Sequence, residues 1–570
     1  MALQTEQTEQ TTPNEGELRR EVGLISLLFS SLGAIIGSGW LFGALYATIE
    51  AGPAAIFSWL IAGAIILLLA LIHAELGGMF PLTGGTARYP QFAFGSVVSF
   101  AAGWIAWVGA VTIAPIEVLA VITYASVYLP WLVTDTVGDF GLLSFPAGYI
   151  VASALMLLFT VVNLMGVKAF AKSNAALVWF KIAVPTVTVL ALLLFAPFDA
   201  SNFSGGDGFM PAGMQGVLTA ISVGGVFFAM FGFEQAIQLG GESSNPRRNI
   251  PLSVIGSVLI GSTIYFGLQL AFVGALPDNA FAKGWSNLSF ANAAGPYAGI
   301  ALLLGLSWLA ITLQVDAAIS PGGTGLIYTA TSARLVYGLS KNGFVPRIFQ
   351  RTSSRDVPIV AIVLSFIVGL IVFFPFPSWI KLVGLIVSAN ALVYAFAPLV
   401  FGALRAQEPD RERPFKLSGG SILAPLGFVA ANYIVYFTGW VTNSKLFLLV
   451  LLGFVVLGIS YAIQPVDQRP PLEWKATGWM WPYFGGMALL SYLGSSEGGK
   501  KAIPFGLDLV LVAVFSVIIY FLAMRARLDP DRARMYIDAT QKEEGVEEPT
   551  DDGGDSSDGR NDGAAARVKK

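Results

Sequence analysis

Apolar residues run in long blocks along most of the chain, and short polar stretches separate the blocks. A helix of about 20 apolar residues, rising 1.5 Å per residue, crosses the hydrocarbon of a bilayer. The thirteenth block is short, so twelve to fourteen spans are expected, and Pro321-Gly322-Gly323 could kink the overlong eighth block. The pattern predicts an all-α polytopic membrane protein. The candidate spans are 23–47, 54–76, 96–129, 146–167, 175–196, 215–240, 252–276, 299–339, 358–375, 380–404, 422–442, 446–464, 479–494 and 505–524.

Composition supports this class and removes several others. Hydrophobic residues make up 55% of the 570 residues and charged residues 12%, whereas soluble domains carry roughly 25% charged residues. The chain has no Cys, and His73 is its single His. Disulfides, thiolate chemistry and the usual zinc or haem ligation are therefore excluded, and we expect no metal and no other cofactor. No basic face or motif suggests a nucleic-acid partner.

The distribution of basic residues predicts the orientation. With the N-terminus inside and one crossing per span, 27 of the 33 Lys and Arg lie on the inner side. Lys181 falls within a span, and the lysines that fall outside are Lys283, Lys381, Lys445, Lys500 and Lys501. Such a bias orients membrane proteins with their basic loops in the cytoplasm. We therefore expect a multi-pass protein of the cell (plasma) membrane with both termini in the cytoplasm.

The same topology divides the chain into parts. Residues 1–22 are polar and precede no cleavage site, which predicts a cytoplasmic N-terminal tail rather than a signal peptide. Span 1 enters from the inside and span 6 from the outside, so if 23–196 and 215–404 are repeats within a core at 23–404, these two five-helix repeats must be inverted. Residues 405–524 supply additional C-terminal helices. Residues 525–570 are poor in apolar side chains and predict a disordered acidic cytoplasmic tail.

Span 1 contains glycines in the middle of its crossing. Each glycine weakens a helix by about 1 kcal/mol relative to alanine, and Gly37 and Gly39 flank Ser38. Unwinding there would strand backbone groups in lipid unless a ligand or cavity satisfies them. The N–H groups that start the outer half-helix would suit a carboxylate. The alternative is close helix packing through the small residues Gly33, Gly37 and Gly43.

Span 6 carries a similar interruption at mid-crossing, over 226–235. It combines Gly232 with an ionisable Glu234 and with bulky aromatic residues. A break here would present carbonyl groups to an ammonium and an aromatic lid to exclude water. The alternative is an aromatic core face with Glu234 hydrogen-bonded between helices. The two segments occupy corresponding positions in the two halves of the core.

Ionisable residues within other spans are further candidates. Lys181 in span 5 could reach the inner surface, or it could point inward to the break of span 1 and couple substrate to protons. Glu117 in span 3 and Asp316 in span 8 are either site residues or structural hydrogen-bond partners. Glu75, near the inner end of span 2, is interpreted as structural.

At these positions the sequence resembles the amino acid–polyamine–organocation superfamily, whose members share the leucine-transporter fold. Four local patterns carry the resemblance, which covers about residues 20–464. The resemblance implies a 5+5 inverted repeat with additional C-terminal helices. The patterns are Gly37-Ser38-Gly39; Ala74-Glu75-Leu76-Gly77 with Phe80-Pro81 and Gly84-Gly85; Gly232-Phe233-Glu234 with Glu242 and Asn245-Pro246-Arg247-Arg248-Asn249-Ile250-Pro251; and Ser332-Ala333-Arg334 with Gly343 and Pro346.

The resemblance also implies a role for individual residues. Backbone N–H groups at Gly37, Ser38 and Gly39 would hold the carboxylate of an amino acid. Phe228 matches an aromatic gate, and Lys181 matches a span 5 lysine of proton-coupled members. Trp40 stands where members often have a smaller residue, and Gly-Ser-Gly-Trp-Leu-Phe is similar to members described as aspartate–proton symporters. The ammonium would be held by carbonyls near Ile35, Ala229, Met230, Phe231 and Gly232, with Trp40, Glu117, Glu234 and Asp316 tuning the pocket.

The sequence therefore predicts a secondary transporter that imports an amino acid with a proton by alternating access. An exchanger of amino acids or amines with the same fold is the nearest alternative. A membrane-embedded enzyme is disfavoured because no catalytic motif or soluble catalytic domain is visible. A non-transporting sensor with this fold is also left open, although the tails contain no obvious signalling domain.

Overall fold

The computed structural model describes residues 21–543 except 83–84, 137–138, 166–167, 293, 354–356 and 467–468. Helices make up nearly all of its regular structure, and the one sheet in this part of the chain is an antiparallel pair of strands, β1 (Val133–Thr136) and β2 (Asp139–Leu143). Nine helical segments of the described residues are long and apolar enough to cross a membrane. The protein is an all-α, multi-pass membrane protein, as predicted.

Each predicted span corresponds to one, two or three helices. The first five spans correspond to α1 (Leu24–Ile35) with α2 (Gly39–Ala51), α3 (Ala55–Met79), α5 (Ser96–Ala125), α6 (Ala147–Leu164) and α7 (Lys168–Phe195). The next five correspond to α8 (Gly213–Ser222) with α9 (Val226–Ala229) and α10 (Gln235–Gln238), α11 (Pro246–Gly274), α12 (Pro296–Leu303) with α13 (Ser307–Lys341), α14 (Ile359–Val372) and α15 (Trp379–Gln407). The last four are α16 (Gly420–Phe437), α17 (Trp440–Ile463), α18 (Met480–Leu493) and α19 (Leu507–Ala526).

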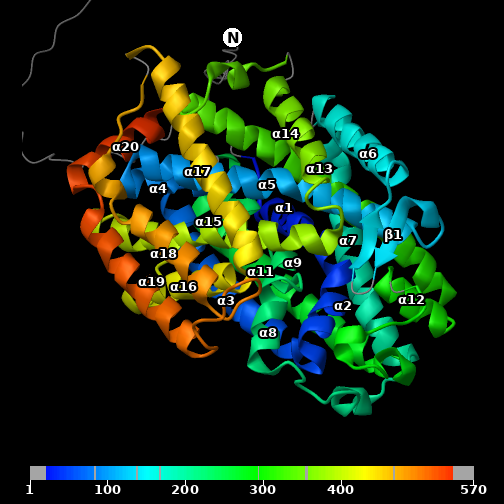
Figure 1. The fold of residues 1–570 in the computed structure, drawn as a ribbon. Coiled ribbons are helices and arrows are strands. Elements are labelled where there is room, and N and C mark those ends of the chain that lie inside the picture. Colours follow the sequence, from blue (N-terminus) through cyan, green and yellow to red (C-terminus); the bar gives the residue numbers. More distant parts are fainter. Residues whose placement is uncertain are drawn as a thin grey trace, which may run out of the picture.

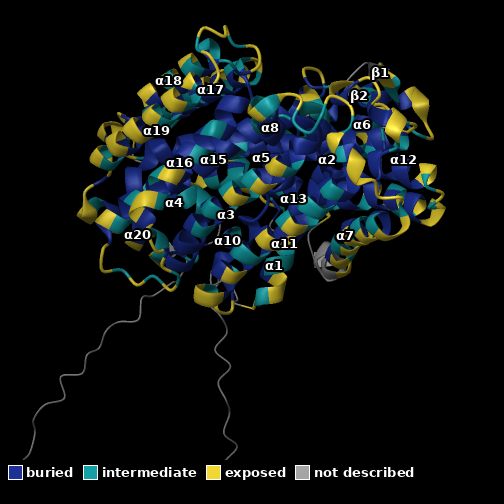
Figure 2. Cartoon of the chain, turned by 90° about the horizontal axis from the view of Figure 1, so that it is seen from below, coloured by how far each residue is buried: buried dark blue, intermediate teal, exposed yellow. Residues whose placement is uncertain are grey.

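The helices form a layered bundle with the most enclosed helices at its centre (Figure 1). Helices α13 and α15 each pack against α5 there, and α5 and α15 are buried over most of their length. The C-terminal helices α18 and α19 lie at one end of the molecule, and α6, α12 and the β-hairpin lie at the other (Figures 1 and 2). Exposed apolar side chains on α17 and α19, such as Leu448 and Val514, would face lipid.

The eighth span contains an interruption that was not predicted. Helix α13 continues through Pro321 from Ser307 to Lys341, so the kink at Pro321-Gly322-Gly323 stays a prediction. The interruption lies earlier, at 304–306, where Gly305 has a φ of +71°. Proline removes only one helical hydrogen bond, and α13 packs against α5.

Two helices outside the predicted spans line the face where the chain enters α1. Helix α4 (Gly85–Phe94) follows α3, and α20 (Pro530–Glu543) packs against α4. The prediction of an unfolded tail over 525–570 is therefore wrong for Pro530–Glu543, while 544–570 lie outside the described residues. Ala533, Tyr536 and Ile537 are buried at helical spacing, which is the pattern of an amphipathic helix.

Candidate functional site

The first span is interrupted where its glycines cluster. Helix α1 ends at Ile35, Ile36 leaves the helical region with a ψ of 83°, and α2 begins at Gly39. This interruption exposes carbonyl groups at the end of α1 and N–H groups at the start of α2. All of these residues are buried, so each exposed backbone group requires a partner from another element.

The sixth span is interrupted as well, and the two interruptions are in contact. Gly225 and Gly232 have φ values of +84° and +122°, which favour glycine. A Cβ atom on Gly39 would lie 2.6 Å from the Cα of Ala229, and one on Gly232 would lie 2.7 Å from the Cβ of Ala34. Glycine at Gly39 and Gly232 therefore allows the broken backbones to approach closely.

Lys181 binds the end of α1. Its Nζ donates to the carbonyl of Gly33 at 2.6 Å and to Oγ1 of Thr324, on α13, at 2.9 Å. The side chain is buried, so of the two predicted orientations the structure has the inward one. A cation is favourable here because the last carbonyls of a helix carry partial negative charge.

Glu117, from α5, binds the start of α2. Its Oε2 accepts from the backbone N–H of Ser38 at 2.9 Å, and the Oγ of Ser38 accepts from Nε1 of Trp379, also at 2.9 Å. A carboxylate at the first N–H groups of a helix is stabilised by the positive end of the helix dipole. The chain's own carboxylate thus lies where the sequence predicts the carboxylate of a substrate.

Gly37 separates the Lys181 and Glu117 contacts. A Cβ on Gly37 would lie 2.6 Å from Oε1 of Glu117 and 3.0 Å from Oγ1 of Thr324. Thr324 is the residue that receives the hydrogen bond of Lys181. Glu117 lies next to Gly37 directly, and Lys181 is linked to the same position through Thr324. Gly37 has no side chain that would keep these groups apart.

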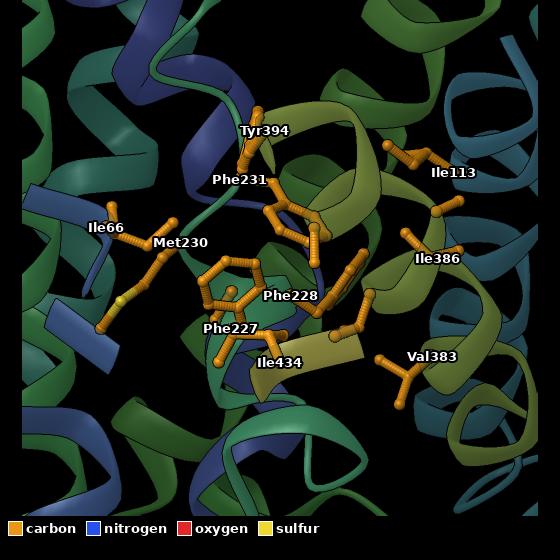
Figure 3. Packing of buried hydrophobic residues seen from close by; sticks show 14 of the residues in the cluster. Ile66, Ile113, Phe227, Phe228, Met230, Phe231, Val383, Ile386, Tyr394 and Ile434 are labelled. Carbon is orange, nitrogen blue, oxygen red and sulfur yellow. The ribbon is translucent and has the colours of Figure 1, made fainter. Parts of the chain in front are cut away.

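A small cavity lies between the two interruptions. Its aromatic wall is formed by Phe228 and Phe231, which pack edge to face with centroids 6.1 Å apart (Figure 3). Oε1 of Glu117 is buried without a hydrogen-bond partner among the described residues, and its side chain lines the cavity. The lining residues are Ala34, Ile35, Gly37, Gly39, Ile113, Glu117, Phe228, Phe231, Thr324 and Tyr328.

Other predicted residues contribute backbone or lie behind the cavity wall. Ala229 and Gly232 lie where the two interrupted backbones are in close contact, as described above. Met230 turns away, toward Ile66 (Figure 3). Trp40 packs against Tyr297 with ring centroids 5.7 Å apart, and Asp316 accepts from the Oγ of Ser320 at 2.6 Å.

Sequence reasoning missed four lining residues: Ala34, which precedes the predicted Ile35, and Ile113, Thr324 and Tyr328. Thr324 and Tyr328 are four residues apart on one face of α13. Gly323, directly before Thr324, is a small residue whose Cβ would lie 3.5 Å from Nζ of Lys181, and it could have drawn attention to this face. Ile113 stands four residues before Glu117 on α5, so the same helix face predicts it once Glu117 is a candidate.

Glu234 belongs to a hydrogen-bonded cluster beside the cavity. Its Oε2 accepts from the hydroxyl of Tyr394 at 2.7 Å and from the N–H of Gly232 at 3.1 Å. Its Oε1 accepts from the hydroxyl of Tyr328 at 3.3 Å. The alternative that Glu234 is bonded between helices therefore describes this structure.

A second, larger cavity of about 710 Å³ lies on the other side of this cluster. It is lined by residues of α3, α4, α5, α13 and α15, including His73, Tyr89 and Asn390. Tyr328 lines both cavities. The cluster of Tyr328, Glu234 and Tyr394 thus stands between the small cavity and the larger one.

Glu75 has the structural role predicted for it. Its carboxylate pairs with Arg405 at 2.7 Å and with Arg413 at 3.4 Å, and it accepts from the N–H of Leu417 at 2.6 Å. These contacts tie the end of α3 to the connection that follows α15.

The sequence of the chain matches the model of a known protein family. The model of the amino acid permease family matches residues 22–456, which include both interruptions and all the side chains around them. The chain belongs to this family. Curated relatives of the permease include the glutamate/serine transporter AimA of Bacillus subtilis (strain 168), 38% identical over 90% of this chain and 94% of that protein. The aspartate-proton symporter of the same organism is 37% identical over 91% of this chain and 99% of that protein. The branched-chain amino acid permease BcaP of Bacillus subtilis is 26% identical over 78% of this chain. The protein is thus an amino acid permease.

Proposed function

We propose that this permease imports amino acids into the cytoplasm across the plasma membrane together with protons. One observation carries the proposal: titratable side chains bind the backbone on both sides of the interruption in the first span. Lys181 binds a carbonyl at the end of α1, and Glu117 binds an N–H at the start of α2. A change in protonation of either group would change how the broken helix is held.

The geometry suggests how proton and substrate binding are linked. The carboxylate of an amino acid and that of Glu117 would compete for the N–H of Ser38. When Glu117 takes up a proton it loses its charge-assisted hydrogen bond to the helix end, and the substrate carboxylate can replace it. The substrate carboxylate takes the place of the Glu117 carboxylate. The site therefore binds substrate best when Glu117 holds a proton or shares one with Lys181, and substrate and proton are carried together.

The remaining parts of the substrate have candidate partners in the same cavity. The carbonyls near Ile35, Ala229 and Phe231 lie at or just after the ends of α1 and α9 and would hold the ammonium, with Phe228 covering it. The names of the two relatives above 30% identity point to acidic or small hydroxyl side chains.

The cluster of Tyr328, Glu234 and Tyr394 is the proposed inner gate. It lies between the small cavity and the larger one, so these hydrogen bonds would break when substrate leaves toward the cytoplasm. The proposed orientation, with both termini inside, puts the larger cavity on the cytoplasmic side because α4 and α20 lie there.

The energetics distinguish the substrate classes. One proton entering across 100 mV supplies about 2.3 kcal/mol, and each tenfold concentration ratio requires about 1.4 kcal/mol. A neutral amino acid carried with one proton could therefore be concentrated roughly fiftyfold by the potential alone. An acidic amino acid with one proton is carried without net charge, and only the pH gradient would drive it.

Uptake into proteoliposomes tests the proposal. We expect an inwardly directed proton gradient to drive accumulation of labelled serine, glutamate or aspartate by the unmodified protein. Lys181→Ala and Glu117→Gln should reduce gradient-driven accumulation at least about tenfold, because each removes a group that binds the break. Lys445→Ala, which changes an exposed lysine of α17, is the matched control and should behave as the unmodified protein.

Counterflow distinguishes symport from exchange. Uptake that requires internal amino acid and ignores the pH gradient would show an exchanger and contradict the symport proposal. Retention of gradient-driven accumulation by Lys181→Ala would show that Lys181 is not the coupling group.

A further inference from the structure

A second polar pocket lies on the face where α13 ends and α5 begins. The cationic residues that line it are Lys341 at the end of α13, Arg347 in the following turn, and Arg469 after α17. No acidic residue lines it within the described part of the chain. The other lining residues are Gln91, Ser96, Ser340, Asn342, Gly343, Gln350, Gln464, Pro470 and Pro471.

Hydrogen bonds fix the loop that forms the pocket. Nε2 of Gln350 donates to the carbonyl of Ser340 at 2.7 Å, and Nε2 of Gln464 donates to the carbonyl of Gly343 at 2.8 Å. The Oγ of Ser340 donates to the carbonyl of Pro346 at 2.8 Å. Two glutamines from different segments therefore hold the loop in place, so the positions of the cations are built into the fold.

The cations of the pocket have no acidic partner in the described part of the chain. Among the described residues, no carboxylate lies within ion-pair distance of Lys341, Arg347 or Arg469. Glu473, four residues after Arg469, already binds Arg532 at 3.1 Å and the N–H of Ser96 at 3.1 Å. Within the described residues, three positive charges therefore line a polar hollow that has no carboxylate.

The chemistry of these groups selects a phosphate. Arginine binds phosphate oxygens with two parallel hydrogen bonds, and lysine adds a point charge. The last turns of α17 lead to Arg469, and on them Ile459 and Ile463 are 55% and 74% exposed. An apolar face beside a cationic hollow is the arrangement that an anionic lipid needs for its chains and its headgroup.

We propose that this pocket binds a phosphate group, carried by an anionic lipid headgroup or by soluble phosphate. The proposal is independent of the substrate site. A bound phosphate would join the end of α13 to the segment after α17. Since α13 also carries Thr324 and Tyr328 further back along the helix, the phosphate would stabilise a helix that lines the small cavity.

The test uses the purified full-length protein and native mass spectrometry with phosphatidylglycerol, phosphatidylcholine and inorganic phosphate. The pocket variant combines Lys341→Gln, Arg347→Gln and Arg469→Gln. The control variant combines Arg248→Gln, Arg351→Gln and Lys416→Gln, which removes three exposed cations that do not line the pocket. We expect the pocket variant to weaken phosphatidylglycerol binding at least about tenfold, since it removes the charge-assisted hydrogen bonds that would hold the phosphate. The control variant should change it less than about threefold.

The phosphate source follows from the other arms. Phosphatidylglycerol binding that millimolar inorganic phosphate does not displace identifies a lipid site, and displacement identifies a site for soluble phosphate. Equal loss in both triple variants would overturn the proposal in favour of general surface charge, as would an absence of both phosphatidylglycerol and phosphate binding. Should the triple variant fail to fold, Arg347→Gln alone decides, because its exposed guanidinium lies on the surface and its change should weaken binding measurably.

Discussion

Gly37 holds the narrowest position of the candidate site. It stands between Glu117 and Thr324, and through Thr324 it lies next to Lys181. Its φ is not in the left-handed region, so sterics alone require glycine here. A single hydrogen in place of a methyl group lets an acid and a base approach the same stretch of backbone.

Gly37→Ala tests this position. The added methyl would lie 2.6 Å from Oε1 of Glu117 and 3.0 Å from Oγ1 of Thr324, so one of the two side chains must move. We expect uptake to fall at least about tenfold, since about 1–3 kcal/mol of overpacking opposes the closed arrangement. The measurement is substrate affinity and uptake rate in proteoliposomes.

Gly322→Ala is the control for this change. Gly322 lies on α13 two residues before Thr324, and a Cβ there meets nothing within 4 Å. Uptake by Gly322→Ala should equal that of the unmodified protein. Equal loss in both variants would mean that glycine content, rather than the approach at Gly37, limits transport.

Local composition was enough to predict some residues of the site and not others. The glycines around Ser38 and at Gly232 mark the interruptions because they weaken a helix wherever they stand. The direction of Lys181 depends on where α1 ends in space, which one helix alone does not reveal. The bond between Glu117 and the N–H of Ser38 depends on the register of α5 against α2, and that register is set by packing.

At the scale of elements, the two interrupted spans depend on each other. The start of α2 touches Ala229 of α9, and Gly232 touches the end of α1. Ser31 of α1 donates from its Oγ to the carbonyl of Phe233 at 2.9 Å, which adds a polar contact across the same boundary. The two breaks therefore form one unit, and a change in one should be felt in the other.

Gly232→Ala should destabilise this unit. Its φ of +122° is unfavourable for alanine, which costs about 1–3 kcal/mol, and the new Cβ would also lie 2.7 Å from Ala34 and Ile35. We expect a lower midpoint of thermal unfolding together with loss of substrate binding.

Gly305→Ala separates the two causes. Gly305 has a φ of +71°, but a Cβ there meets nothing within 4 Å. This variant should lower the unfolding midpoint modestly and leave binding intact. If Gly305→Ala reduces binding as much as Gly232→Ala, the contact between the breaks is not the reason.

At the scale of the whole molecule, the C-terminal helix α20 braces the wall of the larger cavity. The N–H of Leu528 donates to the carbonyl of Ala93 at 3.0 Å, and Nε2 of Gln407 donates to the same carbonyl at 3.1 Å. Arg532 pairs with Glu473 at 3.1 Å, and Tyr536 donates its hydroxyl to the same carboxylate. The pKa of Tyr536 is raised to about 12, mainly by burial and secondly by this hydrogen bond. The hydroxyl therefore keeps its proton at physiological pH.

Removal of α20 should therefore loosen α4. A chain that stops after Arg527 loses the bonds of Leu528 and Arg532, and we expect faster hydrogen exchange over Gly85–Phe94. A chain that stops after Glu543 keeps α20 and should exchange as the full-length protein does. Unchanged protection in the shorter chain would show that α4 is held by the rest of the fold.

This helix also shows the limit of composition as a guide. The tail looks unable to fold because it is poor in apolar residues overall, yet three of them at helical spacing, Ala533, Tyr536 and Ile537, are enough to dock a short helix. Periodicity within 530–543 was visible in the sequence. Its docking surface on α4 was not, because α4 itself lay outside the predicted spans.

The side chains that hold the broken first span have a consequence for the unloaded carrier. Lys181 and Glu117 supply partners for the carbonyl of Gly33 and the N–H of Ser38, so these two backbone groups can stay hydrogen-bonded when no substrate competes for them. The protein should therefore be able to return from its inward-facing to its outward-facing state without bound substrate. Such a return permits net import without the export of a second amino acid.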